Sequence, residues 1–157
     1  MAILHAGRKT QSMTEKLTAE KTIEDRVAAP VQQVWDLLSD FSAITRRTAG
    51  IQDFRIEGEG AGAVRCFRVG DGPILRERIE LWDPINYRFA YALLPPAFMD
   101  DHYSEIRMRA DGPGACVIEW MGRCSVAAQD EVEPRRAFFE TVFRNGIGWV
   151  RKELGVQ

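Results

Sequence analysis

The chain has 157 residues, a length that suits one domain with a sizeable core. Its hydrophobic content of 45% and charged content of 28% are ordinary for a soluble globular protein. A formal net charge of −2 gives no electrostatic basis for binding nucleic acid, and no apolar run reaches the roughly 18 residues of a membrane span. We therefore expect a cytoplasmic protein without a membrane span that binds no nucleic acid.

Three cysteines, Cys66, Cys116 and Cys124, fall within strand-like segments and form no CxxC pair. An odd count without that spacing argues for reduced thiols and against a disulfide framework or a zinc site. We expect all three to be small buried hydrophobic side chains. The sequence shows no other cluster of metal ligands, so no metal and no cofactor are predicted.

Residues 1–19 are polar and show no periodicity, which predicts a mobile N-terminal arm. A single domain is expected to occupy residues 20–157, beginning with a strand of alternating apolar and polar residues. Pro30 then opens a first short helix. A second short helix or turn begins at Phe41 and ends at Gly50.

Between residues 51 and 126 apolar and polar residues alternate, which is typical of strands with one buried face. Short turns rich in Gly, Pro, Asp and Asn separate these strands, and such short connections require antiparallel pairing. The six segments are 51–57, 63–69, 74–82, 87–93, 101–109 and 115–126. With the first strand they predict a seven-stranded antiparallel sheet.

Residues 130–154 are predicted to form a long amphipathic helix. Acidic residues and Pro134 lie in its first turn and basic residues in its last, an order that suits the helix dipole. The apolar stripe recurs at steps of three and four, at Phe139, Phe143, Gly146, Val150 and Leu154. A curved sheet wrapped around the helix is the economical way to bury so wide a stripe, so the predicted fold class is α+β.

Strand parity identifies the side chains that face this helix. Large apolar side chains on that parity include Phe67, Leu75, Phe89, Leu93 and Trp120. Polar side chains that fall on the same parity are Arg65, Glu77, Tyr91, His102 and Ser104.

Arg65 and Glu77 lie on consecutive strands of a hairpin, so we expect them to be cross-strand neighbours that form an internal ion pair. A buried charge is costly unless it is paired or hydrogen-bonded. Two interpretations stay open: the pair is a structural staple in a filled core, or it joins Tyr91 and His102 at the polar end of a ligand cavity. His102 would lie near the cavity mouth, but a one-residue bulge would reverse its direction.

Gly146 lies on the sheet-facing stripe, where glycine costs about 1 kcal/mol relative to alanine. It signals either close backbone packing or room for a guest molecule, and in the second case Gly146→Leu would raise stability. The apolar loop 94–99, with Phe98 and Met99 exposed, is predicted to act as a lid. The loop 69–73 is predicted to be a second gate beside it.

Short motifs follow one another in a characteristic order. They are Val27-Ala-Ala-Pro30 before Val34-Trp35, Gly62-Ala-Val-Arg65, Glu77-Arg78-Ile79 with Asp83, Leu94-Pro95-Pro96, Asp101-His102 with Ser104-Glu-Ile-Arg-Met108, and Ile118-Glu-Trp120. By these motifs the chain resembles the SRPBCC superfamily from about residue 20 to residue 154. This START-like, helix-grip fold is shared by bacterial polyketide cyclase/dehydrase-type proteins, birch-pollen-allergen relatives and plant abscisic-acid receptors. The resemblance implies two short helices between the first two strands and a large cavity for apolar molecules between sheet and terminal helix.

The resemblance also matches Glu77 to an inward glutamate of the family and Arg65 to its usual arginine. Many relatives have an Asp-Tyr pair where this chain has Asp101-His102, with Tyr103 one position later. Either His102 takes the place of that tyrosine, or the register shifts by one residue.

The predicted ligand-binding residues surround the space between sheet and helix. They are Arg65, Phe67, Leu75, Glu77, Phe89, Tyr91, Leu93, Phe98, His102, Ser104, Trp120, Phe139, Phe143 and Gly146.

Three hypotheses for the function follow. The first is a binding protein, monomer or homodimer, for a lipid, a polyketide or another aromatic or isoprenoid-like compound. The second is a polyketide cyclase, aromatase or dehydratase in which Glu77 or His102 acts as general base. The third is a regulator in which ligand-driven closure of loop 94–99 makes a docking surface. We favour the first because the sequence has neither a nucleophile elbow nor a phosphate-binding loop that would demand catalysis.

Overall fold

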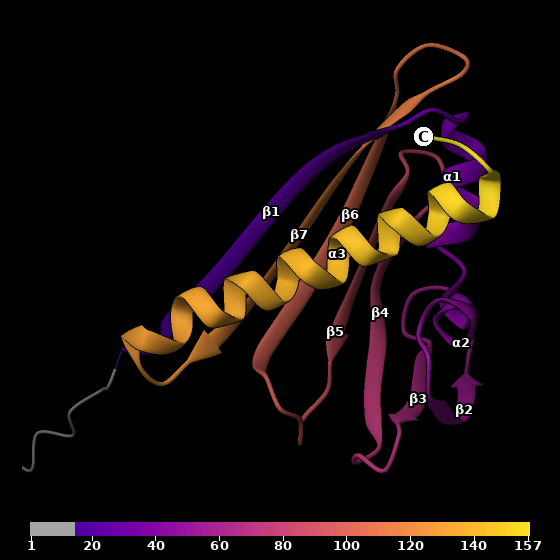
Figure 1. Ribbon diagram of the computed structural model, residues 1–157. Coiled ribbons are helices and arrows are strands. Elements are labelled where there is room, and N and C mark those ends of the chain that lie inside the picture. The colour runs from indigo at the N-terminus through magenta and orange to yellow at the C-terminus, as the bar shows by residue number, and fades with distance from the viewer. Residues whose placement is uncertain (1–14) are drawn as a thin grey trace, which may run out of the picture.

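The computed structural model describes residues 15–157 and confirms the predicted order of strand, two short helices, six strands and long helix (Figure 1). The bounds are β1 Leu17–Val27, α1 Val31–Leu38, α2 Ile44–Arg47, β2 Ile51–Glu57, β3 Val64–Val69, β4 Leu75–Asp83, β5 Arg88–Leu93, β6 Asp100–Ala110, β7 Cys116–Val126 and α3 Val132–Leu154. Single 3₁₀ turns at Phe41–Ala43 and Gln129–Glu131 precede α2 and α3. Most of the predicted arm, residues 1–14, lies outside the described residues, and β1 begins at Leu17 rather than at residue 20.

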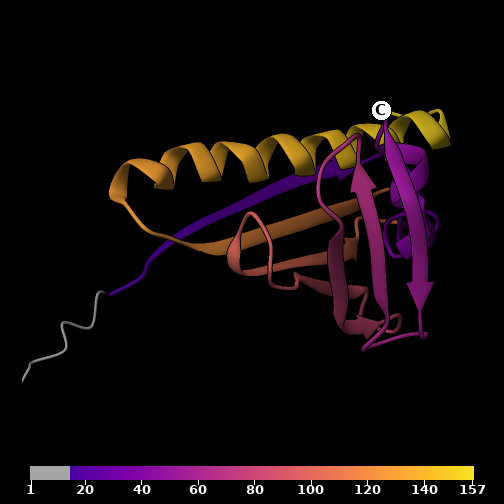
Figure 2. The same cartoon turned by 90° about the horizontal axis from the view of Figure 1, so that it is seen from below.

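The seven strands form one antiparallel sheet in the order β1-β7-β6-β5-β4-β3-β2. β1 pairs with β7 along its whole length, so the first and last strands lie side by side. The sheet is curved, and α3 crosses its concave face (Figures 1 and 2). α1 packs against α3, while α2 lies beside β2. The predicted α+β class, with a curved sheet around a terminal helix, is therefore confirmed.

The long helix has the predicted ends. Pro134 lies in its first turn and Arg151 and Lys152 lie in its last. Gly155 ends it in the left-handed conformation, with φ 64°, and Val156 N–H donates to the Arg151 carbonyl, as in a Schellman motif. None of the helices among residues 15–157 is both long and apolar enough to cross a membrane.

Stacked aromatic rings attach α3 to the sheet. Trp120 of β7 stacks on Phe143 with 4.7 Å between ring centroids, and Phe143 stacks on Phe139. A Cβ atom on Gly122 would lie 2.7 Å from both phenylalanine rings, so the glycine lets the rings lie directly on the strand. The buried face of α3 is formed by Phe139, Phe143, Gly146, Ile147 and Val150. Cys66, Cys116 and Cys124 are buried free thiols, as predicted.

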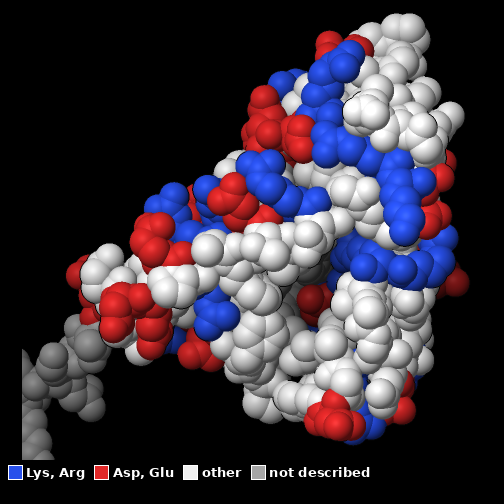
Figure 3. All heavy atoms as spheres, viewed as in Figure 1, with Lys and Arg blue, Asp and Glu red and all other residues white. Residues whose placement is uncertain are grey.

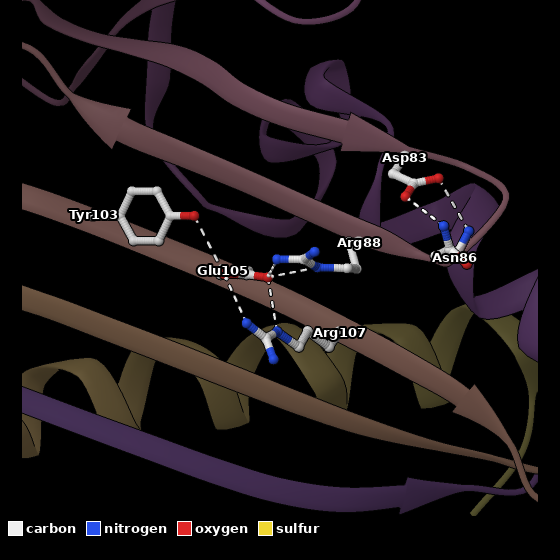
Figure 4. Close-up of polar contacts among 6 residues, drawn as sticks. All are labelled: Asp83, Asn86, Arg88, Tyr103, Glu105 and Arg107. Carbon is white, nitrogen blue, oxygen red and sulfur yellow. Dashed lines mark hydrogen bonds and ion pairs between the residues drawn. The ribbon is translucent and has the colours of Figure 1, made fainter.

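The opposite face of the sheet carries a polar network centred on Glu105 (Figure 4). The carboxylate accepts hydrogen bonds from Arg88, from Arg107 and from the Tyr103 hydroxyl, at 2.8 to 3.4 Å. Burial raises the pKa of Glu105, but the hydrogen bonds from Arg107 and Arg88 outweigh burial and hold this pKa below its ordinary value. In the same view Asp83 accepts hydrogen bonds from Asn86 and closes the turn between β4 and β5.

Two glycines inside α3 have different surroundings. A Cβ atom on Gly146 would lie 2.8 Å from the Trp120 ring, whereas a Cβ atom on Gly148 would meet nothing within 4 Å. Close packing therefore accounts for Gly146. The expected gain in stability for Gly146→Leu is wrong, because Trp120 already occupies the space that a side chain at this position would need.

We predict that Gly146→Ala lowers the free energy of unfolding by about 1–2 kcal/mol, because overpacking against the enclosed Trp120 ring exceeds the gain in helix propensity. Gly148→Ala is the matched control and should raise the free energy of unfolding by about 1 kcal/mol. Urea denaturation of both variants measures the two effects. Equal stabilisation of both variants would show that Trp120 does not pack against α3 as described.

A second prediction concerns acid stability. Glu105→Gln should lower the free energy of unfolding at neutral pH by about 1.5–3 kcal/mol, the usual contribution of a hydrogen bond to an ionised group. Because the folded-state pKa of Glu105 is lowered, its contribution is complete above the ordinary pKa of 4.5 and is lost as pH falls through the folded-state value. Unfolding measured from neutral pH to about pH 3 should show the difference between variant and wild type shrinking. A difference that stays constant over this pH range would contradict a lowered folded-state pKa for Glu105.

Candidate ligand-binding cavity

A cavity lies beneath the middle of α3, between the helix and the central strands. It has an apolar lobe of about 420 Å³ and an adjoining polar lobe of about 370 Å³. Figure 3 shows the hollow under α3, with acidic atoms inside it and basic atoms along its rim. The two lobes share the wall residues Ile44, Thr48, Glu77, Tyr91 and Val142. The apolar lobe and the polar lobe therefore adjoin beneath α3.

The apolar lobe is enclosed by strands β3 to β6, by α3, by the loop between β5 and β6 and by the α2 segment. Its apolar side chains are Ile44, Phe67, Val69, Leu75, Leu93, Phe98, Met99, Phe138, Phe139, Val142 and Phe143. Aromatic rings thus face the space from both the sheet and the helix, a surface suited to an apolar or aromatic molecule.

Most of the predicted binding residues lie on this cavity. Those that line the apolar lobe are Phe67, Leu75, Glu77, Tyr91, Leu93, Phe98, His102, Ser104, Phe139 and Phe143. Arg65 and Gly146 line the polar lobe. Phe89 and Trp120 line neither lobe, since Phe89 packs edge-on against Phe41 and Trp120 lies beneath Phe143.

The sequence pattern does not indicate that α2 and the residues that follow it line the cavity. Ile44, Arg47 and Thr48 come from this segment and line the polar lobe, as does Asn145 of α3. The pair Arg46-Arg47, flanked by Thr45 and Thr48, is the available signal. A helix of four residues has no periodicity from which the direction of its side chains can be predicted.

Arg65 and Glu77 are directly opposed in the β3–β4 ladder, and their predicted ion pair is confirmed. Arg65 Nε donates to Glu77 Oε2 at 2.6 Å, and Arg65 Nη1 donates to the Phe41 carbonyl at 3.0 Å. The guanidinium also lies 4.1 Å from the Phe41 ring centroid. The side chains are only 3% and 14% exposed. Both contacts from Arg65 use Oε2, so no described residue hydrogen-bonds to Glu77 Oε1 at the cavity wall.

A β-bulge decides which residue of β6 faces the cavity. The register of β6 shifts between Asp100 and Tyr103, where Asp101 adopts φ 52°. His102 consequently points inward and is buried, while the Tyr103 hydroxyl donates to Glu105 on the other face. Of the two alternatives left by the sequence, the structure places His102 at the inward position.

The imidazole of His102 is held in one tautomer. Its Nδ1 accepts the backbone N–H of Leu93 at 2.9 Å, so the neutral ring carries its proton on Nε2 and donates it to Ser104 Oγ at 2.9 Å. Burial lowers the pKa of His102, an effect that the Glu77 charge opposes only in part. The ring also stacks on Phe139. His102 is therefore a neutral wall residue whose acceptor nitrogen is already used.

The loop between β5 and β6 reaches across to α3. The Phe98 ring, 51% exposed, packs edge-on against Phe138 with 5.8 Å between centroids, and Arg135 lies beside both rings. Met99 is buried against the core, so the expectation that it is exposed is wrong. Phe98 thus covers one end of the apolar lobe. Val69, at the start of the other predicted gate, is half-exposed and lines the same lobe.

Polar groups gather at the other end of the cavity. Arg47, Thr48, Arg65, Glu77, Tyr91 and Asn145 line this polar lobe. Burial raises the pKa of Tyr91, so the phenol is neutral at physiological pH. Within residues 15–157 no group of His, Cys, Asp or Glu side chains is arranged to hold a metal ion.

Comparison with known proteins gives a family and a fold. The family model described as "Polyketide cyclase / dehydrase and lipid transport" matches residues 10–155. A search of curated proteins finds no match.

Among solved structures, norcoclaurine synthase from Thalictrum flavum in complex with dopamine and hydroxybenzaldehyde superimposes with a TM-score of 0.72 and 16% identity, over 98% of this chain and 95% of that chain. XoxI from Bacillus cereus has a TM-score of 0.71 and 20% identity, over 86% of this chain and 94% of that chain. Ara h 8.0201 has a TM-score of 0.66 and 15% identity, over 87% and 99%. Identities this low show a shared fold.

The family match spans nearly the whole chain, including every element that builds the cavity. It confirms the resemblance predicted from the motifs and supports binding of hydrophobic ligands in general. The chain belongs to the polyketide cyclase/dehydrase and lipid transport family, within the SRPBCC superfamily.

Proposed function

We propose that the protein binds one hydrophobic small molecule, a lipid, a polyketide or another aromatic or isoprenoid-like compound, in the cavity beneath α3. The observation that carries the proposal is the apolar lobe of about 420 Å³, which aromatic side chains line from both the sheet and the helix. Small-molecule sites are usually concave and mostly apolar, with a few polar groups that fix orientation. Glu77, Tyr91 and Ser104 supply such groups in this cavity.

Burial of the apolar body of the ligand would supply most of the binding free energy, at about 25 cal/mol for each Å² removed from water. The walls are held by packing and by hydrogen bonds, as the stacked Phe139 and the fixed His102 illustrate. A preformed wall lowers the entropy cost of binding. The complex of norcoclaurine synthase with dopamine and hydroxybenzaldehyde makes aromatic compounds reasonable candidates for this related fold.

The geometry supports ligand binding better than it supports acid–base catalysis by Glu77 or His102. His102 uses Nδ1 as an acceptor and carries its proton on Nε2, so the neutral ring has no lone pair available to a substrate. Glu77 is held in an ion pair with the buried Arg65, so this carboxylate already has a cationic partner. We therefore retain binding as the proposed function and treat catalysis as an outcome that experiments can detect.

Val142→Trp tests the cavity directly, because Val142 lines both lobes and its half-exposed position on α3 can hold a larger side chain. Wild-type protein should bind the neutral dye Nile red with an increase in fluorescence. The indole of Val142→Trp should fill part of the space and weaken binding by about tenfold or more. Thr141→Trp, at the exposed neighbouring position, is the matched control and should bind as the wild type does.

Titration of the three proteins with the dye, and native mass spectrometry for stoichiometry, provide the measurements. Absence of dye binding by the wild type would refute the proposal. Equal affinity in the two tryptophan variants would place the dye outside this cavity.

Substitutions of Arg65 and Glu77 test whether this ion pair only stabilises the fold or also orients a ligand. Glu77→Gln should lower the free energy of unfolding by about 3 kcal/mol, because the buried Arg65 loses its counter-charge. The double variant Arg65→Met, Glu77→Leu should recover most of that loss, since apolar residues of similar size can replace a buried ion pair. If the pair orients ligand, the recovered double variant should still bind Nile red but should lose preference among ligands with different polar groups. Unchanged preference would assign the pair a structural role alone.

A further inference from the structure

Two adjacent arginines at the end of α2 have different environments. Arg46 lines neither lobe of the cavity and forms an ion pair with Asp40 at 3.1 Å. Arg47 is half-buried, lines the polar lobe and forms neither an ion pair nor a hydrogen bond with any residue in the described range 15–157. Its guanidinium lies 5.9 Å from the Trp120 ring centroid. The fold therefore places an unpaired cation against the cavity.

The charges around the polar lobe do not balance. Arg47 and Arg65 are positive, Glu77 is negative, and Tyr91 and His102 are neutral. Glu77 is already matched by Arg65, so the Arg47 charge remains. Burial lowers the pKa of Arg47 and the neighbouring Arg65 lowers it further, while the charges of Tyr91 and Glu77 oppose this shift in part. An arginine held in this way is a preferred partner for an anionic oxygen.

Two neighbouring side chains of the polar lobe add hydrogen-bond donors. The Thr48 hydroxyl and the Asn145 amide lie on the same wall. An acceptor-rich head group would complement this donor-rich end of the cavity.

We propose that the ligand is an amphipathic carboxylate whose head binds Arg47 in the polar lobe and whose apolar body occupies the aromatic lobe. This inference rests on the proposed binding function and specifies its ligand class. The shared walls at Thr48, Tyr91 and Val142 let one molecule span both lobes. One unpaired guanidinium matches the single charge of a carboxylate, and its planar donors suit the two oxygens.

A matched pair of ligands tests the proposal. Dodecanoate and methyl dodecanoate have the same apolar chain and differ in charge, and both can be titrated as competitors of Nile red. Wild-type protein should bind dodecanoate at least tenfold more tightly than its methyl ester. Arg47→Met should remove this preference by weakening dodecanoate about ten- to a hundredfold, while the affinities for the ester and the dye stay unchanged.

Two further variants serve as controls. Arg46→Met removes the adjacent arginine outside the cavity and should leave the preference intact. Arg47→Lys keeps the charge without the planar donors and should restore part of the preference. Circular dichroism verifies that each variant is folded.

The outcomes separate this inference from the proposed function. If wild type binds the dye and the ester but does not prefer dodecanoate, the carboxylate assignment is wrong while the binding function stands. Equal losses of preference in Arg46→Met and Arg47→Met would also overturn it, because the effect would then be general electrostatic attraction. If wild type binds none of the three molecules, the proposed function fails and the carboxylate site fails with it.

Discussion

The contact on which the rest of the structure depends is the stack of Trp120 and Phe143 beneath α3. Gly146 and Gly122 lack the side chains that would keep the helix and the sheet apart, so the aromatic rings hold α3 tightly against β7. The helix is straight and the sheet is curved, so α3 packs closely on the sheet near β7 and lies farther from the central strands. The space between α3 and the central strands is therefore a consequence of how the helix packs on the sheet. The inward-facing side chains of those strands line this space.

Polar groups on the inner face of the sheet persist because most of them satisfy one another. Arg65 bonds to Glu77 and to a backbone carbonyl, and His102 bonds to a backbone amide and to Ser104. Such contacts offset the desolvation that burial imposes. Arg47, in contrast, lines the polar lobe and forms no ion pair or hydrogen bond with a residue of the described range 15–157. The polar end of the cavity thus differs from the wall around His102, where polar groups bond to one another.

Periodicity in the sequence was sufficient to predict the seven strands, the long helix and the inward parity that includes Arg65, Glu77 and Tyr91. Parity identifies a face but does not tell whether the space before that face is filled, which is why Phe89 and Trp120 were predicted at the cavity and lie in packed core. The direction of His102 depends on a bulge that no local pattern specifies. Arg47 was missed because tertiary packing alone orients a helix as short as α2.

The ionisation of these groups bears on recognition. The lowered pKa of His102 keeps the imidazole neutral through the physiological range, and the raised pKa of Tyr91 keeps the phenol neutral there as well. The charge of the cavity is then set by two arginines and one carboxylate, of which Arg65 and Glu77 cancel. A cavity whose own charge is constant near neutral pH responds to the ionisation of its ligand. It would therefore favour a carboxylic acid in its ionised form over the same molecule protonated or esterified, with the apolar lobe contributing equally to each.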